Sequence, residues 1–246
     1  MKEGQVLKRI IKIIGIVLVA FVIGILTYLG DYYHADQTAH EALIANDQVK
    51  VTEKGNLTIF TPVTGQDEIG IIFYPGGKVE DVAYAPLMQA LAKAGFTAVI
   101  VKMPFNLAVL NPNGADAVME TLPEINHWII GGHSLGGAMA SDYMAGHEEK
   151  VEGLVLMGAY PNEDLALSNH SVISLYGSND QVLNRQAFEA AKEKMPSATT
   201  LYEITGGNHS SFGNYGQQAG DGIASISSAE QQAITVEKIL EIWKGN

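Results

Sequence analysis

The sequence predicts an α/β fold, in which a mostly parallel sheet is covered by helices on both faces, preceded by one transmembrane helix. Short apolar runs alternate with amphipathic stretches, and strands separated by helices form parallel sheets. The 246 residues are 47% hydrophobic and 17% charged, enough apolar material for one sizeable core. A long uncharged run near the N-terminus adds the expected membrane helix.

Charge is unevenly distributed along the chain, which has a net charge of −12. Residues 1–12 contain four basic residues and one acidic residue, Glu3, whereas the whole chain has 15 basic and 27 acidic residues. The body is therefore acidic, which argues against a nucleic-acid partner because phosphate binding needs clusters of Lys and Arg. The chain has no cysteine, which excludes disulfides, thiolate metal sites and a cysteine nucleophile.

Residues 13–29, IIGIVLVAFVIGILTYL, contain no charge. With residues 10–12 they form a helix of about 30 Å, which matches the hydrocarbon core of a bilayer. We expect a basic cytoplasmic N-terminus at 1–12 and a transmembrane anchor at 13–30. The positive-inside rule then predicts a single-pass protein of the cell membrane with its body outside the cytoplasm. A cleaved signal peptide is the alternative, although no Ala-x-Ala site follows the run.

After the anchor we expect a short polar stalk at 31–48 and one domain at 49–246. Amphipathic stretches predict helices at 83–94, 136–145, 184–194 and 229–243, the last with a capping box of Ser227 and Glu230. Seven apolar runs predict strands, at 57–60, 70–74, 97–101, 128–131, 153–157, 172–176 and 200–204. In such sheets, ligands bind beyond the carboxyl ends of the strands.

The strongest motif is Gly132-His-Ser-Leu-Gly136, placed between an apolar strand and a helix of small residues. A sharp strand-to-helix turn strains Ser134 and leaves no room for side chains two residues away, which is why glycines flank it. The hydroxyl then projects above the sheet as a nucleophile. The Leu135 amide, at the start of the helix, is a candidate oxyanion donor.

A serine needs a base to take its proton and an acid to orient that base, and both follow it in the chain in sites of this kind. Three histidines follow Ser134: His147 at a helix end, His170 at a strand start, and His209 just past the last strand. Only His209 lies at the expected edge, so it is the predicted base. Asp180, in the loop after the preceding strand, is the predicted acid.

The second oxyanion donor should come from the loop after the strand at 70–74, which reads Tyr74-Pro-Gly-Gly-Lys. Two glycines let the backbone approach the substrate and turn an amide inward. Gly77 is the preferred donor, and Lys78 is the alternative.

These motifs resemble the α/β-hydrolase superfamily, and most of all a compact bacterial branch with an N-terminal membrane anchor. The resemblance covers about residues 50–246 and implies a fold with a minimal lid or none, the triad Ser134, Asp180 and His209, and oxyanion donors at Gly77 and Leu135. One departure is Pro75-Gly76 where the family commonly has His-Gly. The matching stretches are FYPGGKVEDVAYAPL, VKMPFNLAVL, GGHSLGG, LYGSND and GGNHSSFGNYG.

The sequence therefore predicts a membrane-anchored serine hydrolase that cleaves esters or related acyl compounds, small or lipid, through an acyl-enzyme. No metal or nucleotide motif occurs, so no cofactor is implied. The alternative is a non-catalytic binding or scaffold module tethered to the membrane, because a fold does not fix a function. The sequence leaves the choice among esters, thioesters, lipids and peptides open.

Overall fold

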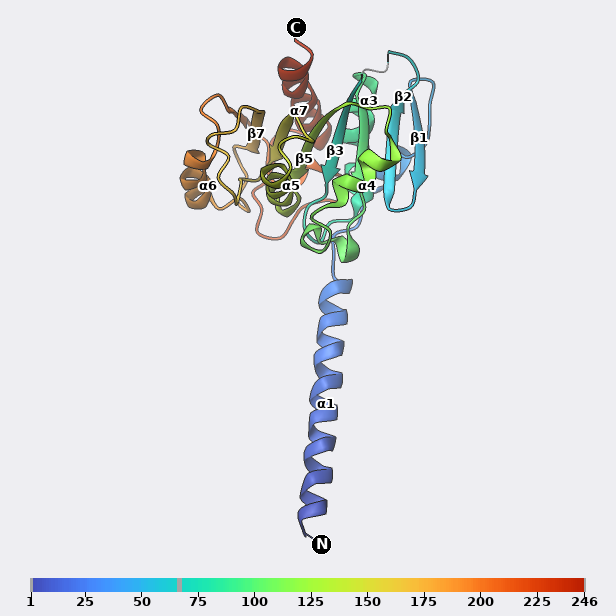
Figure 1. The fold of residues 1–246 in the computed structure, drawn as a ribbon, viewed down its shortest axis with the longest axis vertical. Coiled ribbons are helices and arrows are strands. Elements are labelled where there is room, and N and C mark those ends of the chain that lie inside the picture. The colour runs from blue at the N-terminus through green and yellow to red at the C-terminus, as the bar shows by residue number, and fades with distance from the viewer. Residues whose placement is uncertain (1, 66–67, 246) are drawn as a thin grey trace. The chain divides into compact units, whose positions relative to one another are not determined.

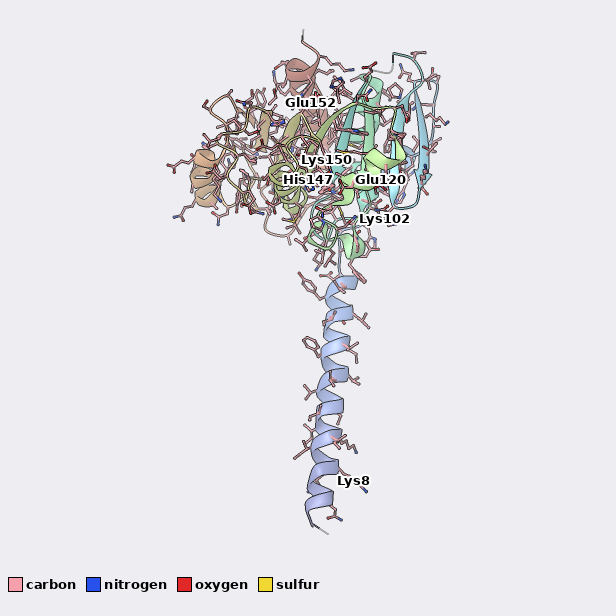
Figure 2. The ribbon with its side chains drawn as sticks, in the orientation of Figure 1. Lys8, Lys102, Glu120, His147, Lys150 and Glu152 are labelled. Atoms are coloured by element: carbon pink, nitrogen blue, oxygen red, sulfur yellow. The ribbon has the colours of Figure 1, made fainter. Side chains whose placement is uncertain are left out.

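The computed structural model describes residues 2–65 and 68–245. The chain divides into two compact units, Met1–Tyr32 and Tyr33–Asn246. The first unit is the helix α1, Lys2–Gly30. Its segment Lys8–Gly30 has a mean hydropathy of 2.8, no part of it is buried, and it is long and apolar enough to cross a membrane or to act as a signal sequence. Figure 2 shows the side chains of α1 projecting on all sides of the helix.

In the second unit the described residues form one eight-stranded sheet in the order β1-β2-β4-β3-β5-β6-β7-β8. β1 pairs antiparallel with β2, and β2 pairs antiparallel with β4. The other six strands, β3 to β8, are parallel to one another. The strands are β1 (Val49–Lys54), β2 (Leu57–Pro62), β3 (Ile69–Tyr74), β4 (Thr97–Val101), β5 (His127–His133), β6 (Gly153–Met157), β7 (Ser171–Gly177) and β8 (Thr200–Ile204).

Helices cover both faces of this sheet. The α-helices of the second unit are α2 (Gln37–Glu41), α3 (Ala85–Lys93), α4 (Gly114–Thr121), α5 (Leu135–Gly146), α6 (Arg185–Ala191) and α7 (Ser228–Trp243). One hydrophobic core contains α3 and α7, and the other contains α4, α5 and α6. In Figure 1, α4 and α5 lie in front of the sheet.

Strand β4 shows how the sequence produces two cores. Ala98 and Ile100 face the core of α3 and α7, whereas Val99 and Val101 face the core of α4 and α5. Successive side chains of a strand point to opposite faces, so a strand covered on both sides is apolar throughout. All five residues of β4 are buried.

The seven expected strands are present, and the expected capping box of Ser227 and Glu230 begins α7. Besides α2, which lies in the segment expected to be a stalk, β1 and α4 were not expected. β1 reads VKVTEK and lies at the edge of the sheet, where only Val49 is buried, so its sequence carries little apolar signal. α4 reads GADAVMET, and its eight residues are too few to show a clear amphipathic pattern.

Residues 31–48 are expected to form a stalk, but the second unit already begins at Tyr33. Tyr33 donates its amide hydrogen to the Lys78 carbonyl at 2.8 Å and forms a parallel bridge with Val79. Asp36 caps α2, and Ala39 within that helix is fully buried. Residues from Tyr33 onward therefore pack as part of the body.

Candidate active site

Ser134 occupies the turn between β5 and α5. Its backbone angles are φ 52° and ψ −123°, a combination that non-glycine residues rarely adopt. The Ser134 amide donates to the Met157 carbonyl at 2.9 Å, which fixes the turn to the end of β6. The turn therefore holds Ser134 at the carboxyl edge of the sheet, where the sequence places it.

The glycines on either side of Ser134 have a steric cause. A Cβ on Gly136 would lie 2.1 Å from the Tyr74 carbonyl oxygen, and one on Gly132 would lie 2.5 Å from the Gly136 carbonyl carbon. These obstacles are backbone atoms and cannot rotate away. The start of α5 thus packs directly on the end of β3, and only glycine fits there.

His209 and Asp180 form a buried pair beside this turn. His209 Nδ1 lies 2.8 Å from Asp180 Oδ2, and both side chains are almost fully buried. The other carboxylate oxygen of Asp180 accepts the amides of Val182, at 3.0 Å, and Leu183, at 2.8 Å. Because a carboxylate only accepts hydrogen bonds, Nδ1 donates and Nε2 carries the lone pair.

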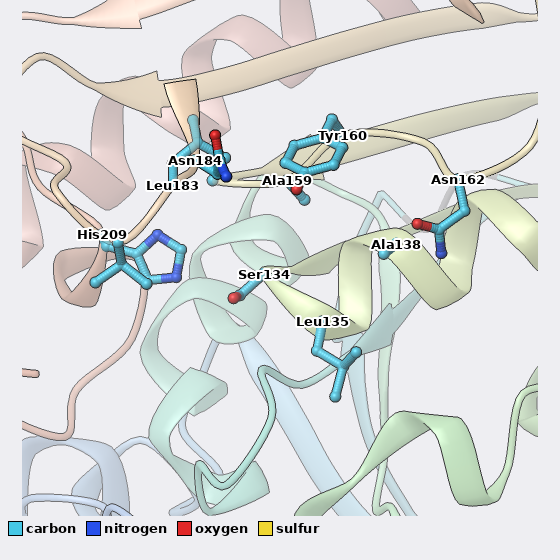
Figure 3. Close-up of a pocket in the computed structure, with 11 residues that line it drawn as sticks. Ser134, Leu135, Ala138, Ala159, Tyr160, Asn162, Leu183, Asn184 and His209 are labelled. Atoms are coloured by element: carbon cyan, nitrogen blue, oxygen red, sulfur yellow. The ribbon is translucent and has the colours of Figure 1, made fainter. Parts of the chain in front are cut away.

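The free nitrogen of His209 is available to Ser134. His209 Nε2 is buried and has no hydrogen-bond partner among residues 2–65 and 68–245. His209 and Ser134 line the same cavity, and Figure 3 shows the Ser134 hydroxyl pointing toward the imidazole. A buried nitrogen without a partner is costly in a folded protein, and such exceptions concentrate at functional sites. A serine hydroxyl and an unpartnered imidazole nitrogen in one cavity are the two groups that proton transfer during nucleophilic catalysis needs.

The loop that carries His209 is held by residues that the sequence reasoning did not single out. The buried side-chain amide of Gln231 accepts the Asn208 amide at 3.0 Å and donates to the Asn208 carbonyl at 2.9 Å. Asp221 accepts the Ser210 amide at 2.8 Å. The sequence does contain an indication of the role of Gln231. It lies four residues before Thr235 and eight before Ile239, on the buried face of α7, and a buried glutamine needs a hydrogen-bond partner.

The loop after β3 lies against the start of α5. A Cβ on Gly77 would lie 2.9 Å from Leu135 Cδ2, so the two predicted oxyanion donors are neighbours. Leu135 is the first residue of α5, and its amide has no partner inside the helix. The Lys78 amide, the alternative donor, instead donates to the Asn106 carbonyl at 2.8 Å. The structure therefore favours Gly77 over Lys78.

A second histidine, His133, lies beside the pair and was not assigned a role from sequence. Its ring centroid is 4.4 Å from that of His209, and its Nδ1 lies 2.8 Å from the Tyr84 hydroxyl. Burial, reinforced by the neighbouring His209, lowers the pKa of His133 well below its usual 6.5. His133 is therefore neutral at neutral pH.

The cavity at Ser134 has a volume of about 330 Å³. Leu135, Ala138, Leu183 and Tyr160 supply apolar lining, and Asn162, Asn184 and His209 are among its polar residues (Figure 3). No helix or strand lies between β6 and β7, where a lid would be inserted. Within residues 2–65 and 68–245, no group of three or more His, Asp or Glu side chains is placed to hold a metal ion.

The fold and the placement of a strained serine after β5 define the class of protein: it is an α/β hydrolase. The sequence profile of the alpha/beta hydrolase family matches residues 70–233, so the chain belongs to that family. The fold expected from the sequence is thereby confirmed. No curated protein sequence is similar enough to this chain to give a match.

Solved structures with the same fold include esterases. The carboxylesterase CesB (YbfK) from Bacillus subtilis is 11% identical, with a TM-score of 0.60 over 85% of this chain and 95% of that protein. Naproxen esterase (carboxylesterase NP) from Bacillus subtilis is 13% identical, with a TM-score of 0.57 over 85% and 96%. Est1E from Butyrivibrio proteoclasticus is 13% identical, with a TM-score of 0.57 over 79% and 98%. At these identities the likeness is one of fold.

Proposed function

We propose that this protein is a membrane-anchored serine hydrolase that cleaves carboxylic esters. The observation that carries the proposal is the buried pair of His209 and Asp180, whose unpartnered Nε2 shares a cavity with Ser134 on its strained turn. A non-catalytic module would have no need to orient an imidazole with a buried carboxylate at the cavity of a strained serine.

In the proposed reaction, Ser134 Oγ attacks the ester carbonyl while His209 Nε2 takes its proton. Asp180 keeps the imidazole in the required tautomer and stabilises the imidazolium that forms. The amides of Gly77 and Leu135 stabilise the oxyanion, helped by the N-terminus of α5. His209 then protonates the leaving alcohol, and water activated by His209 hydrolyses the acyl-enzyme.

Ester substrates are favoured over other acyl compounds by two of the structural neighbours, which are named as carboxylesterases. The open cavity is lined by apolar side chains and asparagines, without a charged lysine or arginine, which suits an uncharged acyl group.

The membrane part of the proposal rests on α1. The segment Lys8–Gly30 is apolar and unburied. Basic residues precede the apolar run, and Asp31 and Asp36 follow it, so the positive-inside rule places the body outside the cytoplasm.

The test is labelling of the full chain with a fluorophosphonate probe, which reacts with activated serines. We expect wild type and the matched control Ser197→Ala, an exposed serine far along the chain, to be labelled, and Ser134→Ala to remain unlabelled. Turnover of p-nitrophenyl esters of rising acyl length then establishes ester hydrolysis. Equal labelling of Ser134→Ala and wild type would overturn the proposal.

A further inference from the structure

The body begins at the edge of the sheet that carries the candidate active site. Tyr33, its first residue, pairs with Val79 in the loop after β3. The same loop contains Gly77, which lies against Leu135. The carboxyl ends of the parallel strands β3 and β5 lie at one edge of the sheet, so the loop that Tyr33 joins begins at the same edge as Ser134.

Few residues connect the proposed membrane span to the body. The helix ends at Gly30, and the body starts at Tyr33. Three residues reach at most about 11 Å, even when fully extended. If α1 spans the bilayer, this short connection limits how far Tyr33 can lie from the lipid headgroups.

An exposed apolar segment lies at the same edge, between β4 and α4. Phe105, Val109 and Leu110 have exposed fractions of 59%, 46% and 52%. Phe105 and Asn106 both have positive φ, 52° and 56°, a strained conformation in two successive residues. The strain occurs where the chain presents a large apolar side chain to the surroundings.

Lys78 connects this segment to the start of the body. The Lys78 carbonyl accepts the Tyr33 amide, and the Lys78 amide donates to the Asn106 carbonyl, each at 2.8 Å. The backbone of Asn106, which follows Phe105 in the chain, therefore bonds the same residue that binds Tyr33, the first residue of the body.

The charge of the segment also fits a bilayer surface. The stretch from Lys102 to Gly114 reads KMPFNLAVLNPNG and contains no acidic residue, although the chain as a whole has 27. Lys102, labelled in Figure 2, is exposed at the start of the segment. An apolar loop flanked by a lysine suits the boundary between acyl chains and phosphate headgroups.

We propose that residues 104–110 insert into the interfacial region of the bilayer, so that the site takes lipid-borne esters from the membrane. This inference rests on the proposed function and adds a substrate class to it: an ester whose acyl chain is dissolved in the bilayer. The absence of a helical or stranded insertion between β6 and β7 leaves the Ser134 cavity open for such a chain.

The first arm of the test measures membrane contact. Because the chain has no cysteine, Phe105→Cys gives a unique site for a nitroxide label in the full chain, reconstituted in nanodiscs of equal phosphatidylcholine and phosphatidylglycerol. Leu167→Cys is the matched control, 96% exposed and close to the start of β7, at the opposite edge of the sheet. We expect accessibility to a water-soluble nickel chelate to be about threefold or more lower at 105 than at 167.

The second arm measures substrate delivery with two esters of one leaving group, umbelliferyl oleate dissolved in the nanodisc and umbelliferyl acetate in water. We expect Phe105→Ser combined with Leu110→Ser to lower oleate turnover about tenfold and to leave acetate turnover unchanged. Leu167→Ser should change neither rate.

The outcomes separate the two proposals. Hydrolysis of neither ester by wild type overturns the proposed function and, with it, the lipid substrate. Hydrolysis of acetate together with equal nickel access at 105 and 167 overturns membrane insertion and leaves the proposed function standing. Protection of residue 105 with unchanged oleate turnover in the double variant overturns the lipid substrate alone.

Discussion

The Tyr84 hydroxyl lies 2.8 Å from His133 Nδ1 and accepts the Gly76 amide at 3.1 Å. The same hydroxyl is therefore hydrogen-bonded both to the Gly76 amide and to the His133 ring. His133 immediately precedes Ser134, and Gly76 immediately precedes Gly77. One buried hydroxyl thus connects the nucleophile turn to the loop of the proposed oxyanion donor.

Tyr84→Phe should therefore lower kcat about tenfold with little change in KM. Loss of the hydroxyl should displace the Gly77 amide, and this amide stabilises the oxyanion of the transition state more than it stabilises the bound ester. The ring keeps its packing in this variant, and only the two hydrogen bonds are lost. Tyr143→Phe is the matched control, since its hydroxyl bonds Asp116, on the surface of α4. Steady-state kinetics on one ester measure both, and an equal loss in the two variants would contradict a positioning role for Tyr84.

His133 should make folding sensitive to acid. Burial lowers the pKa of His133 well below 6.5, whereas in the unfolded chain it titrates near 6.5. The contribution is fully present above about pH 7, and it declines as the pH falls below 6.5, because the unfolded chain then binds a proton that the native state refuses. The slope approaches about 1.4 kcal/mol per pH unit for one proton.

Urea unfolding of wild type and His133→Gln between pH 5 and 7.5 tests this dependence. The variant should lose stability less steeply as the pH falls, by about one proton. The glutamine side chain has both a donor and an acceptor for the Tyr84 hydroxyl, so the hydrogen bond is not the difference measured. Parallel curves for the two proteins would show that His133 is protonated equally in both states.

Ser134→Ala and His209→Ala should each remove most activity, and the double variant should lose little more, because neither group works without the other. Asp180→Asn should cost on the order of 10⁴-fold in kcat, because the amide disturbs the imidazole tautomer. Values of kcat/KM on the best ester, with circular dichroism to check folding, provide the measurement.

His147→Ala and His170→Ala are the controls for these losses. His147 bonds the Tyr143 carbonyl at the end of α5, and His170 bonds Ser168 before β7, both away from the Ser134 cavity. Both variants should keep near wild-type turnover. An active His209→Ala beside an inactive His170→Ala would refute the proposed base.

Local signals made much of the fold and site predictable. Ser134 and Asp180 each follow a strongly apolar strand, whereas His209 follows the edge strand β8, TLYEI, in which only Ile204 is buried. The structure brings Ser134 and His209 to one cavity, with Asp180 bonded to His209. Parallel strands that are buried on both faces leave such runs in the sequence. Edge strand β1 leaves none, because half of its residues face solvent.

Contacts between distant segments were not predictable in the same way. Tyr84 and His133 are 49 residues apart, and Gln231 meets Asn208 across 23 residues. Nothing in the local pattern of either residue specifies its partner. The packing of residues 33–48 on the body depends equally on remote partners, such as Lys78 for Tyr33.

Substitution of glycine by alanine within α5 should separate steric need from helix propensity. A Cβ on Gly136 would lie 2.1 Å from the Tyr74 oxygen, so Gly136→Ala should destabilise the fold by about 3 kcal/mol and reduce activity. Gly146, in the same helix, has nothing within 4 Å, so Gly146→Ala should be neutral or stabilise by up to about 1 kcal/mol. Thermal unfolding measures both, and equal Tm values would refute the close approach of α5 to β3.

The orientation of the chain can be tested through its lack of cysteine, which makes any introduced thiol unique. With the body outside, Leu167→Cys should react with a membrane-impermeant maleimide in intact protoplasts, because this side chain is exposed in the body. Gln5→Cys, before the apolar segment, should react only after lysis. The opposite pattern would reverse the topology, since the thiol at 167 would then be protected until lysis. If a chain beginning near residues 31–40 is recovered without the Gln5→Cys label, the helix is instead a cleaved signal peptide.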